Sequence, residues 1–77
     1  MELDKIVCNQ QILGGKPCII GTRISVEIIL EWLATGATIQ EIVESHPLIS
    51  SEAVKQAIMY ASKFLKNEIV IEVNYAA

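Results

Sequence analysis

Arg23 is the residue whose type and position in this 77-residue chain best suit binding chemistry. It follows Gly21-Thr22, which break an apolar run, and it precedes Ser25, a suitable N-cap for the helix expected next. Arg23 is therefore predicted to lie at a fixed junction between a turn and a helix. A guanidinium there can bind a carboxylate or a phosphate of a partner through two hydrogen bonds. The alternative is an ion pair or carbonyl contact within the chain that fixes the same junction.

A second candidate site lies on a predicted helix over residues 51–66. Lys55 and Gln56 fall in its first turns, where a recognition helix contacts base edges, and Lys63 lies two turns later. On a helical wheel these residues lie opposite an apolar stripe that consists of Val54, Ala57, Ile58, Ala61 and Leu65. The polar face is a candidate DNA-binding surface. The alternative is a solvated helix face.

Catalytic and metal-binding chemistry is not expected. Cys8, Cys18 and His46 lack the close ligand pairs of a zinc site. Gly14-Gly15-Lys16 is followed by proline and lacks the spacing of a phosphate-binding loop. No acid pair or nucleophile with a base is recognisable, so we expect neither an enzyme nor a bound cofactor.

Composition bears on partners and compartment. The net charge of −3, from six basic and nine acidic residues, argues against a strong independent affinity for nucleic acid. Apolar residues make up 52% of the chain, more than one small core easily hides, so a homodimer or burial against a partner is expected. Two cysteines are too few for a secreted disulfide scaffold, and no membrane span or signal peptide is recognisable. We therefore expect a cytoplasmic protein.

The N-terminal third is predicted to form short strands and turns. Candidate strands are residues 5–8, 18–20 and 23–24, and Gly14-Gly15 before Lys16-Pro17 predict a tight reversal. Residues 11–13 are compatible with either a strand or a loop.

Three helices are predicted to follow, over residues 26–35, 39–45 and 51–66. Their N-caps are Ser25, Thr38 and Ser50, and Thr38 forms a capping box with Glu41. Gly36 ends the first helix and Pro47 ends the second.

The first helix is apolar over roughly 200° of its circumference, wider than one core needs. Ile28 and Trp32 lie at the edge of this arc and are candidate partner contacts, since tryptophan is favoured at binding hot spots. The alternative for both residues is ordinary core packing. Ile69 and Ile71 belong to a β-favouring tail with one apolar side. Such a strand must pair with the N-terminal strands or with another chain, so both residues are also candidate partner contacts.

These elements predict a mainly α (α+β) fold in a single domain over residues 1–77. Residues 5–24 form a short N-terminal β-hairpin with its turns, and residues 26–66 form a three-helix bundle of helix-turn-helix, homeodomain-like type. Residues 67–77 form a C-terminal strand or extended tail.

Several of these motifs together resemble domain-of-unknown-function family 433 over about residues 11–66. The motifs are Gly15-Lys16-Pro17, Gly21-Thr22-Arg23, the helix ending at Gly36, Pro47, and Ala57 with Tyr60-Ala61. Members of this family are small helix-turn-helix-related proteins, often described as VapB-like antitoxins. The resemblance implies a non-enzymatic protein that neutralises a PIN-like nuclease toxin and, with it, represses its own promoter DNA. The alternatives are a stand-alone DNA-binding regulator and a structural oligomerisation module.

Overall fold

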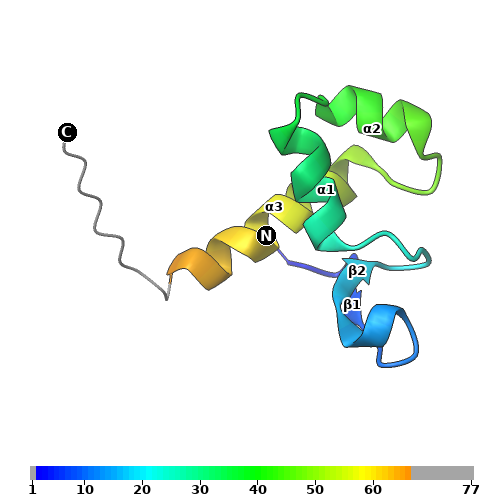
Figure 1. Ribbon diagram of the computed structural model, residues 1–77, viewed down its shortest axis with the longest axis vertical. Helices are drawn as coiled ribbons and strands as arrows, with labels where there is room; N and C mark the ends of the chain where they lie inside the picture. Colours follow the sequence, from blue (N-terminus) through cyan, green and yellow to red (C-terminus); the bar gives the residue numbers. More distant parts are fainter. Residues whose placement is uncertain (1, 67–77) are drawn as a thin grey trace.

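The protein folds as a small α+β domain in which a hairpin precedes three helices (Figure 1). The computed structural model describes residues 2–66, with side chains as far as Lys63. The elements are β1 (Ile6–Cys8), the 3₁₀ turn η1 (Leu13–Gly15), β2 (Pro17–Ile19), α1 (Val26–Ala34), α2 (Ile39–Ser45) and α3 (Ser51–Lys66). The predicted fold class is confirmed. The predicted C-terminal strand lies outside the described residues.

The hairpin pairs β1 with β2 in antiparallel register, with Val7 opposite Cys18. The chain reverses through residues 13–15, whose φ angles are 53°, 65° and 92°. Glycine suits the last two positions because it adopts positive φ without a steric cost. At Gly15 a Cβ atom would also lie 2.9 Å from Nε2 of Gln10. The predicted reversal is therefore confirmed, and residues 11–13 belong to a turn rather than a strand.

The corner between β2 and α1 is held by Thr22. Its Oγ1 donates to the carbonyl of Ile19 at 2.8 Å and accepts from the amide of Ile24 at 3.0 Å. The strand predicted at residues 23–24 is wrong, since only an isolated bridge between Cys18 and Ser25 forms. The chain enters α1 at Val26 directly after that bridge, which leaves no residues to extend the pairing.

The helices begin where their caps predict. Ser25 Oγ accepts from the amide of Ile28 at 3.0 Å, and Ser50 Oγ accepts from that of Ala53 at 3.1 Å. The capping box of Thr38 and Glu41 is formed in both directions. The bounds of α2 and α3 agree with the prediction, and α1 ends one residue earlier than expected.

The core lies where α1 packs on β2 and α3 and where α2 packs on α3. Its buried apolar residues are Cys18, Ile19, Val26, Ile29, Ile42, Ile49, Ala53, Val54 and Ala57. The prediction that Ile58 belongs to the core is wrong, because this side chain is 41% exposed. Ala53, which was not predicted in the core, is buried instead. The buried face of α3 is therefore rotated around the helix axis relative to the predicted apolar stripe.

Gln56 is the buried polar side chain of the described region, with 1% of its surface exposed. Its Oε1 accepts from the backbone amide of Lys5 at 2.8 Å, and its Nε2 donates to Asp4 Oδ1 at 2.9 Å. A further hydrogen bond runs from Nε2 to Glu52 Oε2 at 3.4 Å. The prediction that Gln56 contacts DNA is therefore wrong, because the N-terminal segment covers this part of α3 and its amide group is already engaged.

Replacing Gln56 with alanine is expected to destabilise the fold by about 2 to 3 kcal/mol, because the amide of Lys5 loses its buried acceptor and a cavity is left. Lys55→Ala on the neighbouring exposed position is the matched control and should change stability by about 0.5 kcal/mol or less. Urea unfolding followed by circular dichroism measures both variants. Equal stability of the two would contradict the assigned role of Gln56.

The hydrogen bond from Gln56 to Asp4 also predicts how the Asp4 carboxyl titrates. The hydrogen bond from Gln56, assisted by the positive charge of Lys5, lowers the pKa of Asp4 below its usual 3.8 in the folded protein, against a smaller opposing effect of burial. Because the pKa of Asp4 is lower in the folded protein, the ionised carboxylate stabilises the fold. This stabilisation is fully present at pH values above the pKa of Asp4 in the unfolded chain, and it is lost as the pH falls through the pKa in the folded protein. Carboxyl ¹³C NMR should therefore show an Asp4 pKa that rises towards 3.8 in Gln56→Ala. An unchanged Asp4 titration would contradict the prediction.

Candidate partner-binding site

The turn between β2 and α1 presents an apolar and a cationic side chain together. Ile20 is 53% exposed, and Arg23 is exposed three residues later. Among the described side chains, which end at Lys63, the guanidinium of Arg23 has no hydrogen bond or ion pair. The alternative prediction, an intrachain contact that fixes the corner, is thus not borne out in the described part of the chain.

The backbone of this turn is fixed without any help from Arg23. The two hydrogen bonds of Thr22 close it, and the amide of Ile20 donates to the carbonyl of Lys5 in the N-terminal segment at 2.8 Å. Gly21 supplies the positive φ of 80° that the reversal requires. Because the backbone around Arg23 is already fixed, binding a partner would order only the arginine side chain and not the turn. This lowers the entropic cost of binding.

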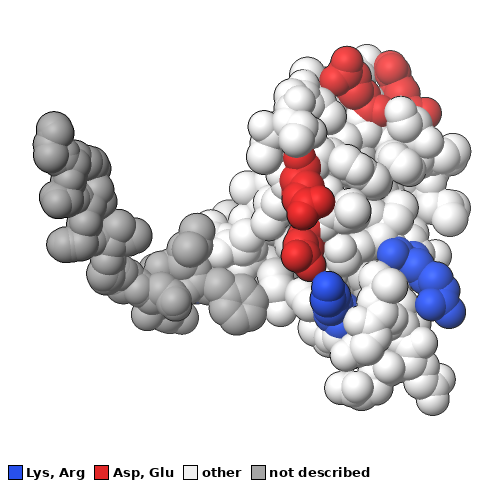
Figure 2. All heavy atoms as spheres, viewed as in Figure 1, with Lys and Arg blue, Asp and Glu red and all other residues white. Residues whose placement is uncertain are grey.

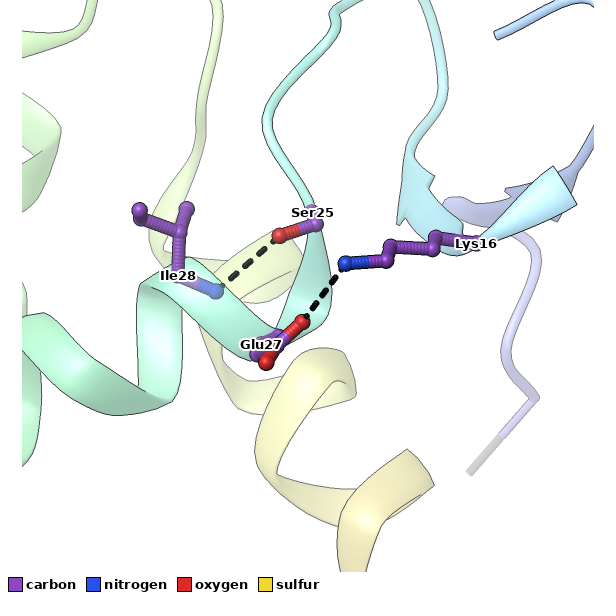
Figure 3. A network of polar contacts seen from close by, with 4 residues as sticks. All are labelled: Lys16, Ser25, Glu27 and Ile28. Carbon is purple, nitrogen blue, oxygen red and sulfur yellow. Dashed lines mark hydrogen bonds and ion pairs between the residues drawn. The ribbon is translucent and has the colours of Figure 1, made fainter. Parts of the chain in front are cut away.

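Lys16, the other cation near this corner, is engaged. Its Nζ lies 3.2 Å from Glu27 Oε1, and Figure 3 shows it reaching from the start of β2 to the first turn of α1, beside the cap made by Ser25 and Ile28. Both partners of this ion pair are more than half exposed. In Figure 2, basic side chains gather at the hairpin end of the visible face, and acidic side chains lie along α1 and on α2. The two ends of this face therefore carry opposite charge.

Ile28 and Trp32, the two residues of α1 predicted to contact a partner, differ in their exposure. Ile28 is 37% exposed and remains available to a partner. Trp32 is partly buried against the core and stacks on His46, with ring centroids 4.5 Å apart and planes at 9°. Its stacking joins the end of α1 to the end of α2, so much of its surface has a structural role.

The predicted DNA-binding residues do not form one surface. Lys55 and Lys63 are exposed, whereas Gln56 between them in sequence is buried. Lys55 lines a hollow between α2 and α3 whose other lining residues include Glu44, so a carboxylate accompanies this cation. Ile69 and Ile71 lie outside the described residues, and their predicted partner contacts remain predictions.

A groove between α1 and α3 was not anticipated as a site. It has a volume of about 680 Å³, and its apolar lining comes from Val26, Leu30 and Ala34 of α1, Tyr60 and Ala61 of α3, and Pro17. Burial, together with the neighbouring Cys8, raises the pKa of the Tyr60 phenol. The signal in the sequence was the width of the apolar arc of α1, which exceeds what one core covers.

Metal and membrane sites find no support in the part of the chain that the structure describes. Residues 2–66 hold no cluster of three or more histidine, cysteine or acidic side chains that could bind a metal ion. Within the same residues, no helix has the length and apolar character needed to cross a membrane.

The structure defines a small α+β domain of three helices with an N-terminal hairpin, and comparison with known proteins gives its family. Residues 6–61 match the family described as "Protein of unknown function (DUF433)". The match covers well over half of the chain and includes the β2–α1 corner and the buried residues of α3 among those described, Ala53 to Ala57. The chain belongs to this family.

Two known proteins are similar to this chain. One is the uncharacterized protein y4eO of Sinorhizobium fredii (strain NBRC 101917 / NGR234), with 30% identity over 56 residues, which is 73% of this chain and 25% of that protein. The other is the crystal structure of a DUF433 member from Anabaena variabilis ATCC 29413, with a TM-score of 0.73 and 25% identity over 77% of this chain and 58% of that one. The chain thus spans about a quarter of the first relative's length and somewhat more than half of the second's.

The stability of the corner that carries Arg23 is expected to depend more on the N-cap formed by Ser25 than on the ion pair between Lys16 and Glu27. Ser25→Ala should cost about 1 kcal/mol of stability, because the amide of Ile28 loses its acceptor. Lys16→Ala should cost about 0.5 kcal/mol or less, because exposed ion pairs contribute little. Chemical unfolding of both variants checks the order, and a larger loss for Lys16→Ala would contradict it.

Proposed function

We propose that this protein is a non-enzymatic, antitoxin-like protein that binds and neutralises a PIN-like nuclease toxin. The observation that carries the proposal is Arg23, an exposed guanidinium on a fixed turn with no partner among the described side chains of residues 2–63. The proposal also draws on the resemblance of the Gly-Thr-Arg motif and its surroundings to small antitoxins.

The chemistry of such a partner suits this turn. A nuclease that binds metal ions through clustered carboxylates offers closely spaced acceptors, and the planar guanidinium can bind a carboxylate through two parallel hydrogen bonds. Occupying these oxygens would displace the catalytic metal or its water. The exposed Ile20 beside Arg23 supplies apolar contact that shields the charged pair from water.

The DNA-binding alternative loses support from the position of Gln56. Its amide is buried and hydrogen bonded, so of the three residues predicted to bind DNA only Lys55 and Lys63 are exposed. The chain also carries a net negative charge, which opposes binding to phosphates. We therefore place any promoter repression in the complex with the nuclease and not in this chain alone.

Arg23→Ala is expected to weaken binding to the nuclease by at least about thirtyfold, as loss of a hot-spot arginine does. Arg23→Lys should recover only part of this loss, because an ammonium cannot form the paired hydrogen bonds. The measurement is purification of tagged wild-type and variant chains from the native cells, with mass spectrometry of the proteins that elute.

The control is Lys55→Ala, which removes an exposed cation from α3 and should leave the co-purified nuclease unchanged. Both alanine variants should unfold within about 0.5 kcal/mol of the wild type, because neither side chain has a described partner. If the wild type elutes without a nuclease, or if Arg23→Ala retains it fully, the proposed function is wrong.

A further inference from the structure

The hollow between α2 and α3 combines an apolar surface with charged side chains. Its volume is about 790 Å³. Ile39 and Val43 of α2, both half-buried, supply the apolar surface, and Glu44 and Lys55 supply one charge from each wall. Protein interfaces typically have this composition, with an apolar centre and a polar rim. The hollow is therefore a candidate docking site for a protein.

The wall that α2 contributes can accept a cation. Nε2 of Gln40 donates to Oε2 of Glu44 at 3.0 Å, and no cation pairs with this carboxylate among the described side chains. A carboxylate accepts several hydrogen bonds, so the other oxygen of Glu44 keeps its capacity to accept. Glu41 is exposed on the same helix, which has no basic residue. The field of α2 thus favours a positively charged occupant.

The corner between β2 and α1 has the complementary composition. Ile20 is 53% exposed, and Arg23 is exposed without a hydrogen bond or ion pair among the described side chains. The hydrogen bonds of Thr22 hold the backbone of this turn, so neither side chain requires the turn to reorder on binding. The corner offers one apolar and one cationic group, which match the apolar surface and the carboxylate of the hollow.

We propose that the hollow between α2 and α3 binds the β2–α1 corner of a second copy of this chain, with Arg23 of one copy paired with Glu44 of the other. Figure 2 shows basic side chains at the hairpin end of one face and acidic side chains on α2 at its other end. Two copies related by a two-fold axis run in opposite directions, so the basic end of each meets the acidic end of the other. The same contact then forms twice, and the opposite charges set the orientation of the two copies.

Lys55 on the α3 wall makes the charge of the occupant testable. An arginine that enters the hollow is attracted by Glu44 and repelled by Lys55, so Lys55→Ala should tighten the contact. An occupant that brings a carboxylate would instead lose its attraction to Lys55 and bind more weakly. The direction of the change therefore distinguishes the corner of a second copy from an acidic partner.

This inference does not rest on the proposed nuclease, because it concerns the chain alone. It adds a regulatory consequence to that proposal, since the same turn cannot lie in the hollow of a second copy and in the nuclease at once. Nuclease binding through Arg23 would separate the two copies.

Sedimentation equilibrium of the full chain, purified without any other protein, tests the proposal. The wild type should form a reversible dimer in the micromolar range, and added salt should weaken it. Arg23→Glu and Glu44→Arg should each raise the dissociation constant at least about tenfold, because each variant places like charges opposite one another. Both residues are exposed, so both variants should stay folded. Glu31→Arg, the same charge change on an exposed residue of α1, is the matched control and should leave the dimer intact.

An equimolar mixture of the Arg23→Glu and Glu44→Arg chains gives the sharpest result. It should dimerise about as tightly as the wild type, because one contact of the mixed pair is native and the other has both charges reversed. A wild type that stays monomeric, a mixture that does not dimerise, or a weaker dimer in Lys55→Ala would overturn the proposal.

A second measurement needs no variant. On dilution of the wild type, amide NMR signals of residues 20–23 and 39–44 should shift, while those of residues 30–34 should not. Shifts confined to residues 30–34 would overturn the proposal, because another surface would then hold the copies together.

Discussion

The hydrogen bonding of Gln56 is the constraint on which the arrangement of this protein depends. A buried amide must find partners for its oxygen and its nitrogen, because leaving either without one costs stability. Gln56 finds them at Lys5 and Asp4, about fifty residues earlier in the chain. These contacts attach the start of the hairpin to the first half of α3. The hairpin is too short to be stable by itself, so its position is set by this attachment and by Ile19 in the core.

From this attachment the geometry of the candidate site follows. Lys5, fixed by Gln56, accepts a hydrogen bond from Ile20 through its carbonyl, and Thr22 closes the next turn. Arg23 is thereby placed on a fixed support at the hairpin end of the molecule. The groove between α1 and α3 is lined in part by the core residue Val26 and by Leu30 and Tyr60, which pack against the core.

The local parts of this structure could be predicted from the sequence, and the distant contacts could not. Caps, glycine turns and helical periodicity depend on neighbours within a few residues, so α2, α3 and the N-caps at Ser25, Thr38 and Ser50 were predicted correctly. The sequence predicts Gln56 on a polar face that is a candidate for DNA binding, because nothing near it in sequence indicates that residues 4 and 5 cover it. Ile58 was predicted in the core because its helical spacing matches that of Val54 and Ala57, and spacing alone does not show where the other elements stop covering the helix. Arg23 was identified as a candidate from its local motif, whereas its lack of a partner among the described side chains could only be seen once the corner was folded.

The central claim is that Arg23 silences a nuclease by binding its carboxylates, and inhibition measures this most directly. The nuclease that co-purifies with the protein would be separated under denaturing conditions, refolded, and titrated with this chain while RNA cleavage is followed. The account predicts that the wild type abolishes cleavage near a one-to-one ratio of chains and that added Mn²⁺ or Mg²⁺ opposes it. Arg23→Ala, although folded, should leave most of the activity. Inhibition by Arg23→Ala equal to that of the wild type, or cleavage unaffected by either chain, would contradict the account.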